Sequence, residues 1–225
     1  MIKKINNLGD AAVYCDFGDE INIKTNSEVL KFFKSIKNSN ILGITNIAPS
    51  YNKLIITFDL DKTNFLKIKK EIENIEAKEN KKNKINTIKI PVCFDDKFAL
   101  DIERLKKKLD LSKKEITEIY LSKDYFCYMT GFIAGMPFLG DIDNKLRIER
   151  LNTPRVKVPK GSVGITEQFC NIYTFESPGG WNIIGNTPIK IFNNISEDQT
   201  TKINTGDKVR FYEISKEEYS ELNEK

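Results

Sequence analysis

Between Thr153 and Pro188 the chain concentrates glycine and proline to a density that ordinary strands and helices do not tolerate. Glycine loses more backbone freedom on folding than any other residue, and proline fixes φ and lacks an amide donor. A segment so rich in both is predicted to form tight, shaped turns between short strands. The blocks are Pro154-Arg155, Pro159-Lys-Gly161-Ser162-Val-Gly164, Ser177-Pro178-Gly179-Gly180-Trp181 and Gly185-Asn-Thr187-Pro188.

The composition is that of a folded protein without a strong electrostatic preference. Of 225 residues, 40% are hydrophobic and 30% are charged, and 36 basic against 32 acidic side chains leave a net charge of only +4. This balance gives little attraction to nucleic acid. No apolar run reaches the roughly 18 residues of a membrane span, and the N-terminus lacks the apolar core of a signal peptide. We therefore expect a cytoplasmic protein that binds neither nucleic acid nor membrane.

The sequence lacks the groups that most enzymes use near neutral pH. There is no histidine, which excludes a histidine-based triad and a histidine-ligated metal site within the chain. There is also no G-x-x-x-x-G-K-[ST] phosphate loop and no G-x-G-x-x-G fingerprint. Four scattered cysteines form no C-x-x-C pair and are interpreted as core residues. We expect no metal, and no cofactor bound by this chain alone.

The beginning of the chain is predicted to fold as an α/β unit. A Thr25-x-x-Glu28 capping pattern predicts a helix that starts near residue 26, and helical spacing from Phe65 to Ile75 predicts a second helix. Strand-like runs surround these helices. They are Ala11–Phe17, Ile41–Ala48, Lys53–Asp59 and Ile88–Val92. The resulting order, β-α-β-β-α-β, is that of a ferredoxin-like sandwich.

A polar segment from Ala77 to Asn86 has little to bury and is predicted to be an exposed crossing between two domains. We place the boundary at its end, which gives an N-terminal ferredoxin-like domain of residues 1–86 and a second domain of residues 87–225. The predicted fold class is α+β.

The second domain is predicted to contain few helices and many short strands. Leu100–Leu109 and a Ser112-x-x-Glu115 capping pattern predict two short helices. From Tyr125 onward, apolar runs are broken by glycine or proline about every ten residues, which is typical of a closed or nearly closed β structure. Arg210–Ile214 and Lys216–Leu222 are predicted to form a last strand and a terminal helix.

Several blocks, taken in order, resemble the B-subunit family of 5-oxoprolinase, which includes a sporulation-kinase inhibitor and allophanate hydrolase subunit 1. The resemblance begins at Gly9-Asp10-Ala11-Ala12-Val13 and continues through Tyr128-Met-x-Gly131-Phe132-x-x-Gly135-x-Pro137-Phe138-Leu139-Gly140 into the glycine- and proline-rich blocks. It implies that the second domain is a cyclophilin-like β-barrel, which periodicity alone does not show.

Residues in or beside these blocks are candidates for binding a substrate or a partner. Arg150 and Arg155 offer planar guanidinium groups for an anion, although they could equally stay solvated or pair with Glu149 and Glu167. The amides of Gly179 and Gly180 could face an anion, and a tight hairpin turn explains them equally well. Core packing and turn hydrogen bonds are the alternatives for the others. The full set is Arg150, Arg155, Pro137, Phe138, Ser162, Ser177, Gly179, Gly180, Trp181 and Thr187; no catalytic residue is assigned.

The resemblance implies a non-autonomous B subunit of an ATP-dependent 5-oxoprolinase. That enzyme converts 5-oxoproline to glutamate with its A and C subunits, of which the latter is homologous to this chain. Whether the chain takes part in catalysis stays open at this point. ATP is expected for the assembled complex. One alternative is a regulatory protein that binds a sporulation sensor histidine kinase and inhibits it. Another is an allophanate hydrolase subunit 1-like protein.

Overall fold

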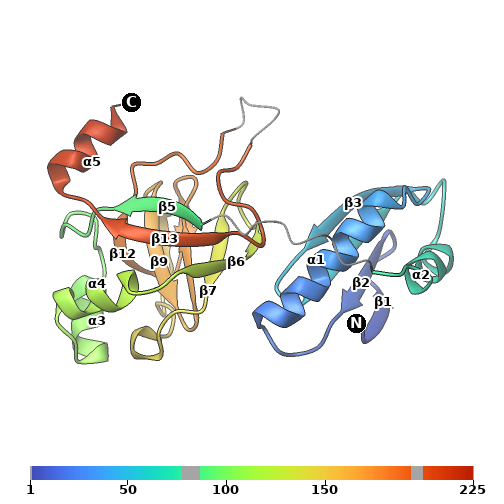
Figure 1. Ribbon diagram of the computed structural model, residues 1–225, viewed down its shortest axis with the longest axis horizontal. Helices are drawn as coiled ribbons and strands as arrows, with labels where there is room; N and C mark the ends of the chain where they lie inside the picture. Colours follow the sequence, from blue (N-terminus) through green and yellow to red (C-terminus); the bar gives the residue numbers. More distant parts are fainter. Residues whose placement is uncertain (1, 78–86, 194–199, 225) are drawn as a thin grey trace. The chain divides into compact units, whose positions relative to one another are not determined.

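The computed structural model describes residues 2–77, 87–193 and 200–224 (Figure 1). The chain divides into two compact units, Met1–Lys84 and Ile85–Lys225, close to the boundary expected after residue 86. Nearly all of the predicted crossing, residues 78–86, lies outside the described residues. Within the described residues, no helix is long and apolar enough to cross a membrane.

The first unit is an antiparallel sheet covered by two helices. The strands are ordered β1-β2-β4-β3, and every neighbouring pair is antiparallel. Both helices pack their apolar stripes on the sheet through residues such as Val29, Phe32, Ile68 and Ile72. The elements are β1 (Lys4–Asn7), β2 (Ala12–Asp16), α1 (Ile23–Asn38), β3 (Ile44–Pro49), β4 (Lys53–Phe58) and α2 (Phe65–Glu73).

The β-α-β-β-α-β order predicted for this unit is wrong. The strand expected at Ile88–Val92 exists as β5 (Thr87–Val92), but it belongs to the second unit, where it pairs in parallel with β13 (Lys208–Glu213). The first unit instead begins with β1, a short and mostly exposed strand that pairs with β2. Its order is therefore β-β-α-β-β-α. Periodicity identifies a strand but does not say which sheet it joins.

Helix α1 also begins earlier than the capping pattern predicts. The N-cap is Asn22, whose side-chain oxygen accepts a hydrogen bond from the amide of Thr25 at 2.8 Å. Asparagine caps helix N-termini as well as serine or threonine does. The helix therefore starts at Ile23, about one turn before residue 26.

The second unit is a mixed sheet rolled into a nearly closed barrel. Its strands are ordered β12-β9-β10-β7-β6-β13-β5. The two ends of this order meet where Cys93 and Asn186 exchange backbone hydrogen bonds of 2.9 and 3.0 Å. This confirms the predicted α+β fold with a barrel. The remaining strands are β6 (Tyr125–Thr130), β7 (Pro137–Gly140), β9 (Ser162–Thr166), β10 (Phe169–Ile172) and β12 (Asn182–Asn186).

Helices α3 (Ile102–Leu109) and α4 (Lys113–Leu121) lie side by side against the barrel (Figure 1). Both predicted helices are confirmed, and α4 begins with a complete capping box between Ser112 and Glu115. The C-terminal helix α5 (Lys216–Asn223) is confirmed as well.

The interpretation of the four cysteines as core residues is confirmed. All four are buried and free. Burial disfavours the thiolate. It raises the pKa of Cys15 and of Cys170 to about 12. The thiols of Cys15 and Cys170 therefore stay protonated and behave as small apolar side chains.

A small two-stranded sheet, β8 (Arg155–Val158) with β11 (Ser177–Gly179), stands apart from the barrel strands. Side chains alternate along a strand, so Cys170 and Ile172 of β10 point into the barrel core while Asn171 points to the outside. On that outer side a second apolar cluster forms from Met136, Val158, Tyr173 and Ile183. The outer side of the sheet is thus built up into a second layer, and most of the predicted site residues lie there.

Candidate functional site

The outer side of the barrel sheet brings several predicted site residues together with residues that the sequence did not single out. A side chain at Gly180 would lie 3.6 Å from the guanidinium of Arg150, and one at Gly179 would meet the hydroxyl of Tyr173. The rings of Phe138 and Trp181 are 5.7 Å apart in an edge-to-face arrangement. We call this region the Arg150 face and define it as Phe138, Arg150, Arg155, Asn171, Tyr173, Gly179, Gly180 and Trp181.

Arg155 is held by an acidic residue that the sequence did not reveal. Its guanidinium donates two hydrogen bonds, of 3.0 and 2.6 Å, to the carboxylate of Asp101, which is 5% exposed. The same carboxylate accepts a bond from the amide of Ile183 at 2.7 Å. Asp101 is the N-cap of α3 but makes no side-chain capping bond, because its oxygens face Arg155. The pair ties the β8 strand to α3 and β12.

The expected alternative partner of Arg155 is engaged elsewhere. Glu149 bonds to Arg104 at 3.0 Å and to Lys108 at 3.2 Å. A backbone amide and these two cations keep the pKa of Glu149 at about 2. The guanidinium of Arg155 is therefore paired with Asp101 within the barrel unit. The role of Arg155 that the structure shows is structural.

Arg150 is the cation of this face that is not already neutralised. It is exposed and makes no ion pair with any residue in 2–77, 87–193 or 200–224. The backbone beside it is fixed by two hydrogen bonds. The backbone amide of Leu151 donates to Gly180 O at 2.8 Å, and the side-chain amide of Asn182 donates to Glu149 O at 3.0 Å. A fixed backbone with a solvated guanidinium is suited to binding a planar anion.

Two polar side chains of this face, Asn171 and Tyr173, are buried, and Asn171 has unused hydrogen-bonding capacity. Asn171 is fully buried, and neither of its amide atoms makes a well-formed hydrogen bond to the described residues. The hydroxyl of Tyr173 lies close to it. Burial raises the pKa of Tyr173, while the Asn171 amide and the positive charges of Arg150 and Arg155 oppose that rise. The hydroxyl stays protonated at neutral pH and serves as a donor.

Gly179 has a steric reason to be glycine. A Cβ at this position would sit 2.2 Å from the Tyr173 hydroxyl oxygen, far inside ordinary contact. At Gly180 the nearest atoms would be 3.6 Å away, which is an ordinary contact. The close approach of the β11 backbone to Tyr173 therefore accounts for Gly179 without requiring an anion.

The other predicted residues lie elsewhere or have structural partners. Ser162 and Thr187 lie at the far end of β9 and β12, where Thr187 accepts a turn hydrogen bond from the amide of Ile189 at 3.2 Å. Pro137 opens β7 opposite Thr130. Ser177 lies on β11 with a buried hydroxyl that has no hydrogen-bond partner in the described part of the chain. The predicted residues therefore do not form a single site, since some lie on the Arg150 face and the others lie outside it.

The Arg150 face can bind and orient a ligand but has no group that could remove a proton near pH 7. The neighbouring carboxylate of Asp101 is committed to Arg155, and burial raises the pKa of Tyr173, the tyrosine of this face. Among the described residues, no cluster of three or more cysteine, aspartate or glutamate side chains could hold a metal ion.

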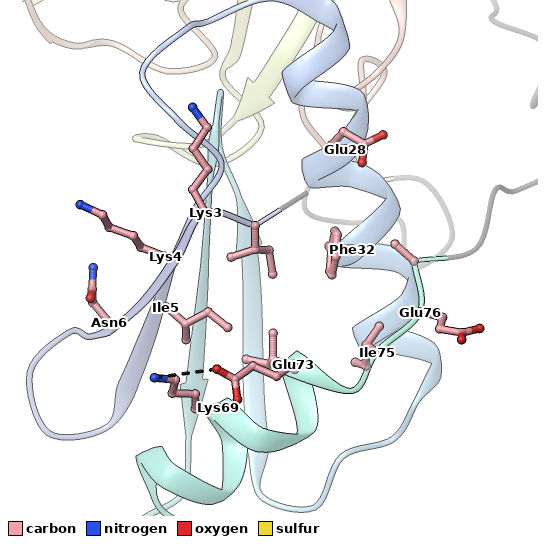
Figure 2. A pocket seen from close by; sticks show the side chains of 13 residues that line it. Lys3, Lys4, Ile5, Asn6, Glu28, Phe32, Lys69, Glu73, Ile75 and Glu76 are labelled. Carbon is pink, nitrogen blue, oxygen red and sulfur yellow. Dashed lines mark ion pairs between the residues drawn. The ribbon is translucent and has the colours of Figure 1, made fainter.

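The large cavity of the first unit has a different character. It has a volume of about 760 Å³ and lies between β1, α1 and α2. Figure 2 shows Ile5, Phe32 and Ile75 turned toward its interior, and the ion pair of Lys69 with Glu73 at its edge. Its lysines and glutamates are equal in number, so it has no net preference for a charged ligand. None of the predicted site residues lines it.

A curated protein and a solved structure match the chain almost end to end. It is 31% identical over 233 residues to the 5-oxoprolinase B subunit of Bacillus subtilis, covering 98% of this chain and 97% of that protein. A conserved uncharacterized protein of Pyrococcus horikoshii has a solved structure with a TM-score of 0.58 and 34% identity, covering 96% of this chain and 100% of that one.

Larger proteins contain the same fold as one part. The urea amidolyase of K. lactis matches with a TM-score of 0.83 at 20% identity, covering 98% of this chain but only 15% of the amidolyase. This chain covers 40% of the length of another solved protein chain that it matches. The family model described as "Carboxyltransferase domain, subdomain C and D" matches residues 3–202. The chain therefore belongs to the carboxyltransferase subdomain C and D family, within its 5-oxoprolinase B-subunit group.

Proposed function

We propose that this chain is the B subunit of an ATP-dependent 5-oxoprolinase that converts 5-oxoproline to glutamate together with its A and C subunits. The observation that carries the proposal is the match over 97% of the Bacillus subtilis B subunit. The Arg150 face adds support, because one of its arginines makes no ion pair with a described residue and the face lacks a general base. Such a surface suits a protein that contributes part of a composite site.

The substrate fits the chemistry of this face. 5-Oxoproline carries a planar carboxylate, which the guanidinium of Arg150 can bind through two parallel hydrogen bonds. Its ring carbons can pack against the half-buried pair of Phe138 and Trp181. Opening the lactam requires an activated carbonyl, and in the assembled enzyme ATP would supply that activation by phosphorylation. This chain's own residues would bind and orient the ring.

Replacing Arg150 by alanine is expected to lower kcat/KM for 5-oxoproline in the assembled enzyme at least about tenfold, because both charge-assisted hydrogen bonds to the substrate carboxylate are lost. Arg147 is a matched control, because it is also exposed and makes no ion pair within the described residues. Arg147→Ala is expected to leave kcat/KM unchanged. Steady-state kinetics on both variants measure this, and equal losses in the two would remove Arg150 from the site.

Co-purification tests the assignment against its alternatives. Tagged protein is expected to recover two metabolic subunits, and the recovered mixture is expected to hydrolyse 5-oxoproline with ATP. Recovery of a sensor histidine kinase, with loss of its autophosphorylation, would instead support the inhibitor. Recovery of an amidase that cleaves allophanate would support the allophanate hydrolase subunit 1-like alternative.

A further inference from the structure

The barrel unit has a pocket, separate from the Arg150 face, that is lined by positively charged side chains. It has a volume of about 190 Å³ and is formed by residues 160–161, 173–174 and 187–191 together with helix α5. Among the described residues, its lining includes Lys160 and Lys190 and no aspartate or glutamate. It also contains Thr187, one of the predicted residues that lies away from the Arg150 face.

The walls of this pocket are held rigidly by the backbone. Gly161 has a φ of +80°, and a side chain there would lie 2.4 Å from the carbonyl oxygen of Thr187. Thr187 donates its amide to Gly161 O at 2.9 Å, and the Asn186 side chain donates to Lys160 O at 2.9 Å. The segments that carry Lys160 and Thr187 are therefore locked together, which is why the sequence requires a glycine at position 161.

Helix α5, near the C-terminus in Figure 1, contributes Tyr219 and Asn223 to the lining of the pocket. The ring of Tyr219 packs on Phe98 with centroids 4.3 Å apart. Its hydroxyl donates to the side-chain oxygen of Asn186 at 2.9 Å, since the amide nitrogen of that asparagine is already a donor to Lys160. The helix is thus fixed to the same wall.

Within residues 2–77, 87–193 and 200–224, no acidic side chain pairs with the lysines of the pocket. Lys160 and Lys190 are exposed and form no ion pair within the part of the chain that the structure describes, whereas Lys157 pairs with Glu176 at 3.2 Å. The Thr187 oxygen accepts the turn bond from Ile189, so its own proton is available to a ligand. Two cations and a hydroxyl donor around a small cavity create a site for an anion.

We propose that this pocket binds a phosphate group, either as free phosphate or as part of a larger molecule. Its volume of about 190 Å³ equals roughly six water molecules at about 30 Å³ each, which admits a phosphate group but not a whole nucleotide. Lysine binds phosphate as a point charge, whereas a planar carboxylate is better matched by an arginine fork, and no arginine lines the pocket. This inference does not depend on the oxoprolinase assignment.

Titration calorimetry of the full chain with inorganic phosphate, and separately with ATP, tests the site. Binding is expected for at least one of the two, and Lys160→Ala with Lys190→Ala is expected to weaken it at least about tenfold, the effect of losing a charge-assisted hydrogen bond. Lys114→Ala with Lys157→Ala removes the same charge from exposed lysines outside the pocket and is the matched control. It is expected to leave the affinity unchanged.

The two ligands separate the possible sources of phosphate. Equal or tighter binding of inorganic phosphate supports a site for the free ion, and tighter binding of ATP with the same lysine dependence supports a nucleotide phosphate. The proposal is overturned if neither ligand binds, or if the control pair weakens binding as much as the pocket pair. Should the alanine pair lower the melting temperature, Lys160→Gln with Lys190→Gln replaces it, because glutamine keeps most of the side-chain bulk without charge.

Discussion

Replacing Asp101 by alanine is expected to lower the free energy of unfolding of the barrel unit by about 3 kcal/mol. The carboxylate is 5% exposed and binds both the guanidinium of Arg155 and the amide of Ile183. Its removal leaves these two donors without partners next to the second apolar layer. Arg155 can recover part of its hydration because its side chain is 29% exposed, which places the loss at the lower end of the range for a broken buried pair.

Chemical denaturation of single and double variants measures this contribution. Asp101→Asn keeps an acceptor for Ile183 and is expected to cost about half as much as alanine. The double variant Asp101→Ala with Arg155→Ala is expected to be more stable than the sum of the single effects predicts, by about 1 kcal/mol or more. Strictly additive effects, or a loss below about 1 kcal/mol for Asp101→Ala, would show that the pair does not hold β8 in place.

Replacing Gly179 by alanine is expected to lower kcat/KM of the assembled enzyme about a hundredfold, because a displacement of about 1 Å in a site has that effect. The added Cβ would lie 2.2 Å from the Tyr173 hydroxyl, whereas ordinary contact begins near 3.4 Å, so β11 or the tyrosine has to move by more than 1 Å. The same overpacking is expected to cost about 1–3 kcal/mol of stability.

Gly180→Ala is the matched control for this prediction. The new methyl group would meet its nearest atoms at 3.6 Å, so the melting temperature is expected to stay close to that of the unmodified protein, and kcat/KM is expected to fall much less than in Gly179→Ala. Kinetics and thermal unfolding of the two variants decide the matter. If Gly179→Ala retained full activity, the Arg150 face would not be the site, whatever its effect on stability.

Much of the fold could be predicted from the sequence because its signals are local. Ser112 and Glu115 form the predicted capping box, and Ile68 and Ile72 lie buried on one face of α2 as their spacing requires. The assignment of β5 could not be predicted in this way. Its partner β13 begins at Lys208, far along the chain, and nothing local to Ile88–Val92 distinguishes the two sheets.

The candidate site shows the same division between local and distant signals. The prediction of shaped turns from the glycine- and proline-rich blocks is confirmed at Gly161 but is wrong for Gly164, Gly179 and Gly185, which lie inside strands. Gly161 and Gly179 both have a structural reason to be glycine. Asp101 gave no signal, because an isolated aspartate before a helix reads as an ordinary N-cap. Asn171 gave none either, since one polar residue in a strand does not reveal that it is buried without well-formed hydrogen bonds. Such residues acquire meaning only when distant segments meet.

The central claim is that this chain is an obligatory but non-autonomous part of a 5-oxoprolinase. The most direct measurement is glutamate formation from 5-oxoproline with ATP, in purified mixtures that contain or omit this chain. We predict hydrolysis when the chain is combined with the A and C subunits, and none from the chain alone or from the other two without it. Hydrolysis at full rate by the other two subunits, with this chain omitted, would contradict the account.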